Sequence, residues 1–141
     1  MKLLVACDGS KTALRAVKYA AKLLESLSKG GKITLISVHD DVALSHAMRF
    51  VGKAAVDDYL RELSEKDLSA ARKLLDKSNV KHDMIVSHGH IAAEIAKAAS
   101  HGKFDLIVMG SKGRSALKDI LIGSVAMRVN ELASVPTLLV K

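Results

Sequence analysis

The hydrophobic positions along the chain alternate between two spacings. Short continuous apolar runs are typical of strands buried on both faces. Longer stretches, in which apolar residues recur every three or four positions, are typical of one face of a helix. Runs of the first kind are residues 2–7, 32–38, 80–86, 104–109 and 136–140. We therefore predict five strands, the last of which opens on the only proline, as a strand tolerates at its first residue.

The stretches between these runs predict four helices. The first follows Ser10, a candidate N-cap, and ends at Gly30-Gly31. The second covers residues 54–77, where Asp67 falls at a position at which the face expects an apolar residue. The remaining apolar faces lie at residues 91–99 and 125–132. Residues 39–53 are irregular and polar at their start, so we predict no helix and assign no role there.

Strands that alternate with helices predict an α/β fold, here a single domain over residues 1–141. The strands pair in parallel through right-handed crossovers, with helices on both faces of one sheet. Such sheets bind ligands beyond the carboxyl ends of their strands, where the strand order reverses. Candidate site residues are therefore 8–10, 38–40, 88–90 and those after 109.

The segment after the fourth strand has the most informative spacing, G-x2-G-x9-G-S, formed by Gly110, Gly113, Gly123 and Ser124. Gly110 lets another backbone or a phosphate approach closely, and Gly113 can adopt the positive φ of a tight loop. Gly123 and Ser124 precede a helical face, where free backbone N–H groups form an anion site.

Lys112, Arg114 and Lys118 add positive charge between these glycines. The segment therefore predicts a phosphate site. In the alternative interpretation the glycines only turn the chain and the serine only caps a helix.

The chain resembles the universal stress protein family over essentially its whole length. The matching segments are Asp8-Gly9-Ser10, MGSKGRSALKDILIGSVAMRV and the terminal VPTLLV. The glycine pattern marks the ATP-binding branch of that family. The resemblance implies a three-layer Rossmann-like fold (adenine nucleotide alpha hydrolase-like) with a five-stranded sheet of order 3-2-1-4-5. It also implies a homodimer that pairs the last strands, Pro136 to Val140.

The resemblance implies ATP, with Mg²⁺, as the ligand, and assigns its contacts by position. One group lines the nucleoside pocket, with Asp8 near the ribose or adenine. A second borders the ribose and phosphates, and a third holds the phosphate chain. The three groups are Ala6, Cys7, Asp8 and the Val38 backbone; Met109, Gly110 and Gly113; and Arg114, Ser115, Gly123, Ser124 and Val125. Cys7 stands where members often have proline, threonine or valine.

Composition narrows the choice of partners. The longest apolar run in the 141 residues is five residues, which is too short to span a membrane. The chain has a single cysteine, so no internal disulfide can form, and we expect a cytoplasmic protein. The net charge of +7 favours a polyanionic partner, which makes a basic nucleic-acid-binding module one alternative. The four aromatic residues are scattered and form no base-stacking platform, so nucleic acid is not the expected partner.

We expect an ATP-binding regulatory module of the stress response, with slow ATP hydrolysis or self-phosphorylation as the enzymatic alternative. Asp8 and Asp40 could touch the water shell of a metal, yet no separate base is identifiable, so no catalytic residue is assigned. Cys7 has no local histidine partner and is interpreted as a core or pocket residue. His88 and His90 are interpreted as surface residues, and no metal site is assigned, although His90 could approach a triphosphate.

Overall fold

The computed structural model describes residues 1–27, 30–114 and 121–141, and its five strands form one parallel sheet. The strands are β1 (Lys2–Ala6), β2 (Lys32–Asp40), β3 (Lys81–Gly89), β4 (Leu106–Gly110) and β5 (Thr137–Val140). Their order is β3-β2-β1-β4-β5, which confirms the expected α/β fold and strand order. Because the order reverses on either side of β1, a ligand is expected beyond the ends of β1 and β4.

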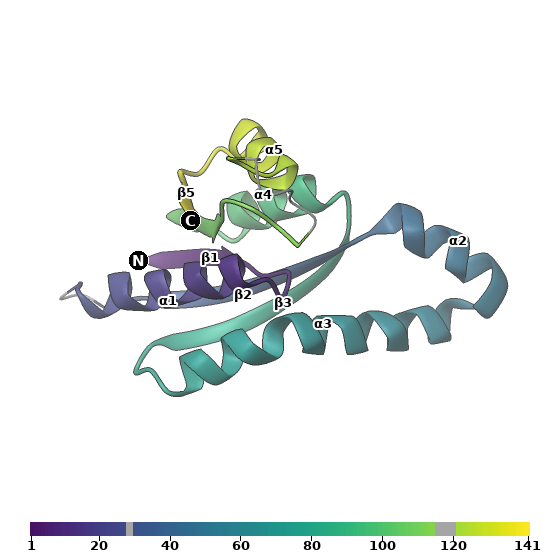
Figure 1. The fold of residues 1–141 in the computed structure, drawn as a ribbon, viewed down its shortest axis with the longest axis horizontal. Coiled ribbons are helices and arrows are strands. Elements are labelled where there is room, and N and C mark those ends of the chain that lie inside the picture. Colours follow the sequence, from purple (N-terminus) through teal and green to yellow (C-terminus); the bar gives the residue numbers. More distant parts are fainter. Residues whose placement is uncertain (28–29, 115–120) are drawn as a thin grey trace.

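Helices cover both faces of this sheet (Figure 1). They are α1 (Lys11–Glu25), α2 (Asp41–Val51), α3 (Lys53–Asp76), α4 (Ile91–His101) and α5 (Ser124–Leu132). Buried side chains of α1 and α3 form one core with one face of the strands, and those of α4 and α5 form a second core with the opposite face.

The alternation of side chains along β1 explains why two cores exist. Leu3 and Val5 point into the α1–α3 core, and Leu4 points into the α4–α5 core, all with no exposed surface. Successive residues of a strand face opposite sides of the sheet, so an unbroken apolar run supplies both cores.

The turn between β1 and α1 places the first helix close to the strand ends. Gly9 has a φ of 76°, in the left-handed region that glycine adopts without strain. Ser10 is the N-cap of α1, and its hydroxyl accepts a hydrogen bond from the Ala13 amide at 3.1 Å, as the sequence predicts.

The expectation for residues 39–53 is wrong. His39 and Asp40 extend β2 and pair with His88 and Gly89 of a β3 that is longer than predicted, and α2 follows at once. The segment from 41 to 51 contains neither Gly nor Pro, which is why it can be helical, and Gly52 ends it with a φ of 81°.

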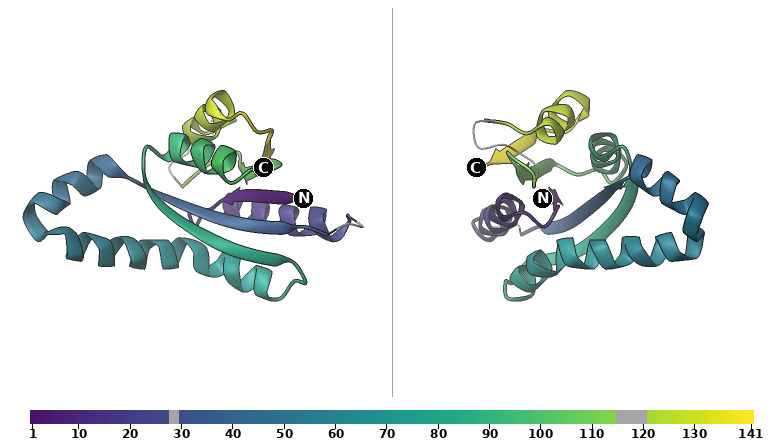
Figure 2. Two further views of the ribbon diagram at one scale, coloured as in Figure 1. Left: turned by 180° about the vertical axis from the view of Figure 1, so that it is seen from behind. Right: turned by 45° about the vertical axis from the view of Figure 1, so that its right-hand side comes forward.

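The prediction missed α2 because it followed the polar start of the segment, although Leu44, Ala47, Met48 and Val51 recur at helical spacing. Of the described side chains, Leu44 is buried. Met48, Phe50 and Val51 are all exposed, Phe50 to 87%. Figure 2 shows α2 and the start of α3 extending beyond the end of the β2–β3 pair.

Two further observations concern the helices. In the part of the chain that the structure describes, no helix is both long and apolar enough to cross a membrane. On α1, the side chains of Lys11, Arg15, Lys18 and Lys22 recur at helical spacing and are all exposed.

Candidate functional site

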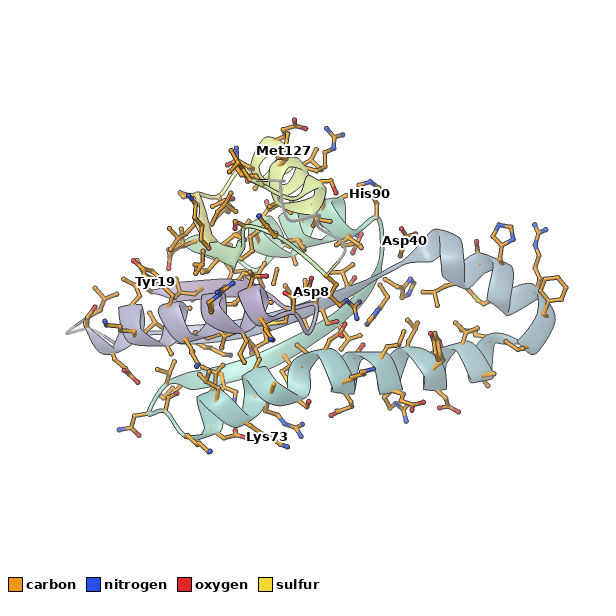
Figure 3. All side chains as sticks on the ribbon, in the orientation of Figure 1. Asp8, Tyr19, Asp40, Lys73, His90 and Met127 are labelled. Carbon is orange, nitrogen blue, oxygen red and sulfur yellow. The ribbon has the colours of Figure 1, made fainter. Side chains whose placement is uncertain are left out.

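A cavity of about 480 Å³ opens at the carboxyl ends of β1, β2 and β4, between these strands and the starts of α4 and α5. Its volume lies within the range of about 300–1,000 Å³ that is usual for small-molecule sites. Figure 3 shows Asp8, Asp40 and His90 at this end of the sheet. Every predicted site residue that the structure describes lines the cavity, namely Ala6, Cys7, Asp8, Val38, Met109, Gly110, Gly113, Arg114, Gly123, Ser124 and Val125. Ser115 lies outside the described residues.

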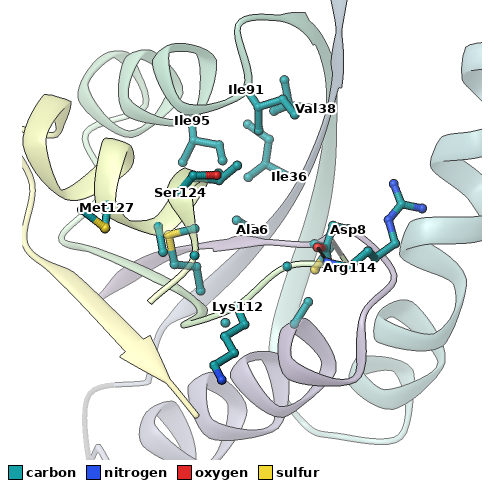
Figure 4. Close-up of a pocket in the computed structure, with 18 of the residues that line it drawn as sticks. Ala6, Asp8, Ile36, Val38, Ile91, Ile95, Lys112, Arg114, Ser124 and Met127 are labelled. Carbon is teal, nitrogen blue, oxygen red and sulfur yellow. Dashed lines mark hydrogen bonds between the residues drawn. The ribbon is translucent and has the colours of Figure 1, made fainter. Parts of the chain in front are cut away.

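One end of the cavity is apolar. It is formed by Ile36 and Val38 at the end of β2 and by Ile91 and Ile95 on α4, which gather on one side of Ser124 in Figure 4. The sequence pattern assigned the two α4 residues only to a helical core face. A planar, uncharged group such as a nucleobase would find van der Waals contact here and no charged side chain.

The other end contains the first turn of α5. Gly123 is the N-cap and has no side chain to cap the helix, so the first amides of α5, from Ser124 onward, have no partner within the helix. These N–H groups and the helix dipole favour an anion. The Gly123 amide is already used, because it donates to the Ser111 carbonyl at 2.7 Å. An anion would therefore meet the amides at the start of α5 itself.

The loop after β4 is held against the start of α1. A Cβ atom at Gly110 would lie 3.0 Å from the backbone carbonyl carbon of Thr12, so glycine here admits the backbone of α1. The Thr12 hydroxyl then donates to the Lys112 carbonyl at 2.6 Å. Gly113 does not adopt the expected positive φ. Its lack of a side chain instead leaves room for Asp8, whose Oδ2 would be 3.1 Å from a Cβ at this position.

Asp8 links the two loops at the cavity. Its Oδ1 accepts the Ser10 amide at 2.9 Å, and its Oδ2 accepts the Arg114 amide at 3.2 Å. The carboxylate thus fixes the backbone of the glycine motif relative to β1. The side chain of Lys112 points away from Ser124 toward α1 in Figure 4, so its charge is not directed at the start of α5.

Asp67 on α3 is a cavity residue that the sequence pattern did not assign to the site. Its side chain is 5% exposed, and its Oδ1 lies 3.4 Å from Nη1 of Arg114. The only sequence signal was a charged residue on the apolar face of the helix. In the structure this face meets the cavity at Asp67, so the break in the pattern marks the site.

Cys7 and the histidines contribute no reactive group at the cavity. Burial, reinforced by the charges of Asp8 and Asp67, raises the pKa of the Cys7 thiol to about 12, so the thiolate is not formed near neutral pH. His90 is exposed at the N-cap of α4 and does not line the cavity. Among the described residues, no three His, Cys, Asp or Glu side chains are grouped to hold a metal ion.

Comparison with known proteins gives the chain a family. The profile described as "Universal stress protein family" matches residues 1–141. The chain belongs to the universal stress protein family. It is 33% identical to the universal stress protein MJ0531 of Methanocaldococcus jannaschii, over 99% of this chain and 81% of that protein.

Solved structures of universal stress proteins have the same fold. MJ0577, also a universal stress protein of M. jannaschii, is 30% identical with a TM-score of 0.86, over 99% of this chain and 94% of the other. A universal stress protein family protein from Arabidopsis thaliana, solved with AMP bound, has a TM-score of 0.66 at 19% identity, over 100% and 91% of the two chains.

Proposed function

We propose that this universal stress protein is a regulatory module of the stress response that binds ATP in the cavity at the carboxyl ends of β1, β2 and β4. The observation that carries the proposal is the combination, in one cavity, of an aliphatic end and an uncapped helix N-terminus. An adenine nucleotide has the same two-part chemistry, with an apolar base joined to an anionic chain. The AMP bound to the Arabidopsis relative supports a ligand of this class.

The described residues suit each part of the nucleotide. The adenine would pack among Ile36, Val38 and Ile91 at the aliphatic end. The phosphate oxygens would accept hydrogen bonds from the free amides at the start of α5 and from the Ser124 hydroxyl. Ser115, which lies outside the described residues, remains a predicted phosphate contact. Mg²⁺, if it accompanies ATP, would be held mainly by phosphate oxygens, as is usual for this ion.

Isothermal titration calorimetry tests the proposal directly. Protein first shown to be free of nucleotide, by its absorbance ratio and by chromatography of a denatured sample, is titrated with ATP in the presence and absence of Mg²⁺. We expect saturable binding with one ATP per chain. Absence of heat at millimolar ATP, in protein that is folded by circular dichroism, would refute the assignment.

A regulatory role is favoured over catalysis by the chemistry of the cavity wall. The buried Cys7 is held as a neutral thiol, and Asp8 already accepts two backbone amides. Hydrolysis or self-phosphorylation remains the alternative, and labelled ATP separates the two. Phosphate release or protein labelling that disappears in the Gly113→Val variant would establish the enzymatic role.

We further propose a homodimer through Pro136–Val140. β5 is an edge strand of the sheet, and Ile107 and Ser111 donate their amides to the Pro136 and Val140 carbonyls at 2.9 and 2.8 Å. By the alternation of a parallel ladder, the Leu139 amide faces outward, where a second copy can accept its hydrogen bond.

Light scattering measures the dimer directly. We expect a dimer for the parent protein and for Leu139→Val, and a monomer for Leu139→Pro, which removes that amide. A monomeric parent at high concentration would refute this interface. That the module acts in the cytoplasm stays a prediction.

A further inference from the structure

Arg114 belongs to the glycine motif, and its side chain contacts a carboxylate on a different element. Its guanidinium extends away from Ser124 toward α3 in Figure 4, and its Nη1 lies 3.4 Å from Oδ1 of Asp67. The backbone of the same residue is held by Asp8 through its amide. The preceding residue, Gly113, lies against the N-cap of α5, since a Cβ atom at Gly123 would be 3.5 Å from the Gly113 amide nitrogen. The side chain of Arg114 therefore starts from a fixed backbone that is close to α5 as well as to α3.

The described residues give the carboxylate of Asp67 few hydrogen-bonding or charged partners. It sits on the inner face of α3 between the buried residues Ser64 and Leu68. The Ser64 hydroxyl is directed elsewhere, since it donates to the Leu60 carbonyl and bonds to His39. Among the described residues, Arg114 is the cation that pairs with Asp67. A buried carboxylate that loses its cation carries a large desolvation penalty.

The contact between the two residues is nevertheless weak. Charge-assisted hydrogen bonds are normally about 2.7–2.9 Å long, and Arg–carboxylate pairs are often bidentate. Here a single pair of atoms meets at 3.4 Å, and the Arg114 side chain is 57% exposed. A phosphate chain at the start of α5 carries more charge and offers bidentate geometry, so it can capture the guanidinium.

Asp67 is also placed so that it cannot easily follow Arg114 or move aside. A Cβ atom at Gly9 would lie 2.9 Å from its Oδ1, so the left-handed β1–α1 turn packs directly on the carboxylate. The free energy needed to separate Arg114 from Asp67 therefore reduces the affinity of any ligand that binds Arg114.

We propose that Asp67 competes with the phosphate chain of a bound ligand for the guanidinium of Arg114, and thereby sets how strongly the cavity favours phosphorylated ligands. The inference rests on the proposed nucleotide site. It makes Asp67 a positioning residue that acts through Arg114. Ligands without phosphate leave the pair intact, and ligands with a phosphate chain exchange one partner of Arg114 for another.

The test compares three ligands by calorimetry: adenosine, ATP and inorganic tripolyphosphate, which has a phosphate chain but no nucleoside. Asp67→Asn keeps the shape of the side chain and removes its charge. We expect it to bind ATP and tripolyphosphate about tenfold more tightly, with adenosine affinity unchanged within about twofold. Asp58→Asn, the same change at an exposed position of α3, is the matched control and should alter none of the three affinities.

A double-variant cycle separates competition from simple charge repulsion. In an Arg114→Gln background, Asp67→Asn should improve ATP affinity by less than about threefold, because the shared partner is gone. An equal gain in both backgrounds overturns the competition. So does an unchanged or weaker affinity for ATP in Asp67→Asn, which would mean that Arg114 contacts Asp67 and phosphate together.

A measurement on the unaltered protein does not depend on how the variants fold. The ¹³C chemical shift of the Asp67 carboxyl carbon should change when tripolyphosphate is added and stay constant when adenosine is added. A chemical shift that does not change with tripolyphosphate overturns the proposal. Tripolyphosphate binding that responds to Asp67→Asn in a protein that binds no ATP would leave the competition standing and refute the nucleotide function. Failure of all three ligands to bind would refute both.

Discussion

The two ends of the cavity are built by different means. The aliphatic end is made of side chains from β2 and α4, including Ile36 and Ile95, which are 1% and 3% exposed and belong to the core. The end at which we propose that phosphate binds is made of backbone, the first turn of α5, and is fixed by hydrogen bonds between loops. One end is therefore part of the core, and we expect its affinity for a ligand to depend on shape. We expect the affinity of the other end to depend on the backbone amides that have no partner in the protein.

This contrast predicts that substitutions at the two ends will change the affinities for the nucleoside and for the phosphate chain independently. A change at the start of α5 should be felt only by ligands with phosphate. A change at the aliphatic end should be felt equally by adenosine and ATP.

The largest effect is expected from Ser124→Asp. Its carboxylate would compete for the free amides of α5 and repel phosphate, so we expect ATP affinity to fall by at least about 100-fold, or about 2.7 kcal/mol. A carboxylate near a helix N-terminus stabilises the helix, so the melting temperature should not fall. Calorimetry with ATP and adenosine provides the comparison.

The control for this substitution is Ser124→Ala, which removes only one hydroxyl donor and should cost ATP about fivefold, or about 1 kcal/mol. Adenosine should bind both variants as it binds the parent. If Ser124→Asp weakened adenosine as much as ATP, the two ends of the cavity would not be independent.

An intermediate effect is expected from Ile91→Ala at the aliphatic end. Ile91 is half-buried at the start of α4, so its truncation removes ligand contact with less damage to the core than truncation of Ile95. Adenosine and ATP should each lose about fivefold in affinity, because about 1 kcal/mol of apolar contact is removed from both. Loss of ATP affinity alone would place the base elsewhere.

The smallest effect concerns the buried His39 of β2, whose Nε2 lies 2.9 Å from the Ser64 hydroxyl oxygen. Burial lowers the pKa of His39 below its ordinary value of 6.5, with a smaller contribution from Arg114, while Asp67 acts in the opposite direction. Below about pH 6.5 the unfolded chain therefore binds a proton that the folded chain does not. The free energy of unfolding should fall as the pH falls from 7.5 to 5.5.

Urea unfolding at these two pH values measures this effect in the parent and in His39→Gln, which should lose less stability on acidification. His101→Gln, at an exposed position of α4, is the control. Burial alone would raise the pKa of the Asp83 carboxyl, but hydrogen bonds from Lys32 and Thr34 lower it below its ordinary value. Asp83 therefore affects the free energy of unfolding only below about pH 4 and does not interfere with this measurement. An identical acid response in the parent and His39→Gln would show that the buried ring is not responsible.

The fold could be predicted because its signals are local and repeated. Unbroken runs such as the one that contains Leu3, Leu4 and Val5 require burial on both faces, and only helices on either side of a parallel sheet supply it. The helix α2 escaped prediction because its segment begins with polar residues, and the helical spacing of Leu44, Ala47, Met48 and Val51 was not used. In the structure Leu44 is buried, while Phe50 is exposed.

The candidate site could be predicted only in part. Residues that a motif fixes, such as Gly110 and Ser124, were placed at the cavity by their spacing. Asp67 was not, because its role arises from contacts with residues far away in the chain, Gly9 and Arg114. The positive φ expected of Gly113 was also wrong, and the structure needs glycine there for a different purpose. The space beside Gly113 is taken by Asp8, a contact that spacing alone does not reveal.

The two backbone hydrogen bonds of Ser111 provide a way for ligand affinity to depend on protein concentration. The amide of Ser111 donates to the carbonyl of Val140 on the edge strand, and its carbonyl accepts the amide of Gly123 at the N-cap of α5. Two consecutive hydrogen bonds thus connect the rim of the sheet to the anion-binding turn. If two copies associate along that rim, a change in strand geometry is transmitted to the turn, and ligand affinity measured in dilute and in concentrated protein would differ.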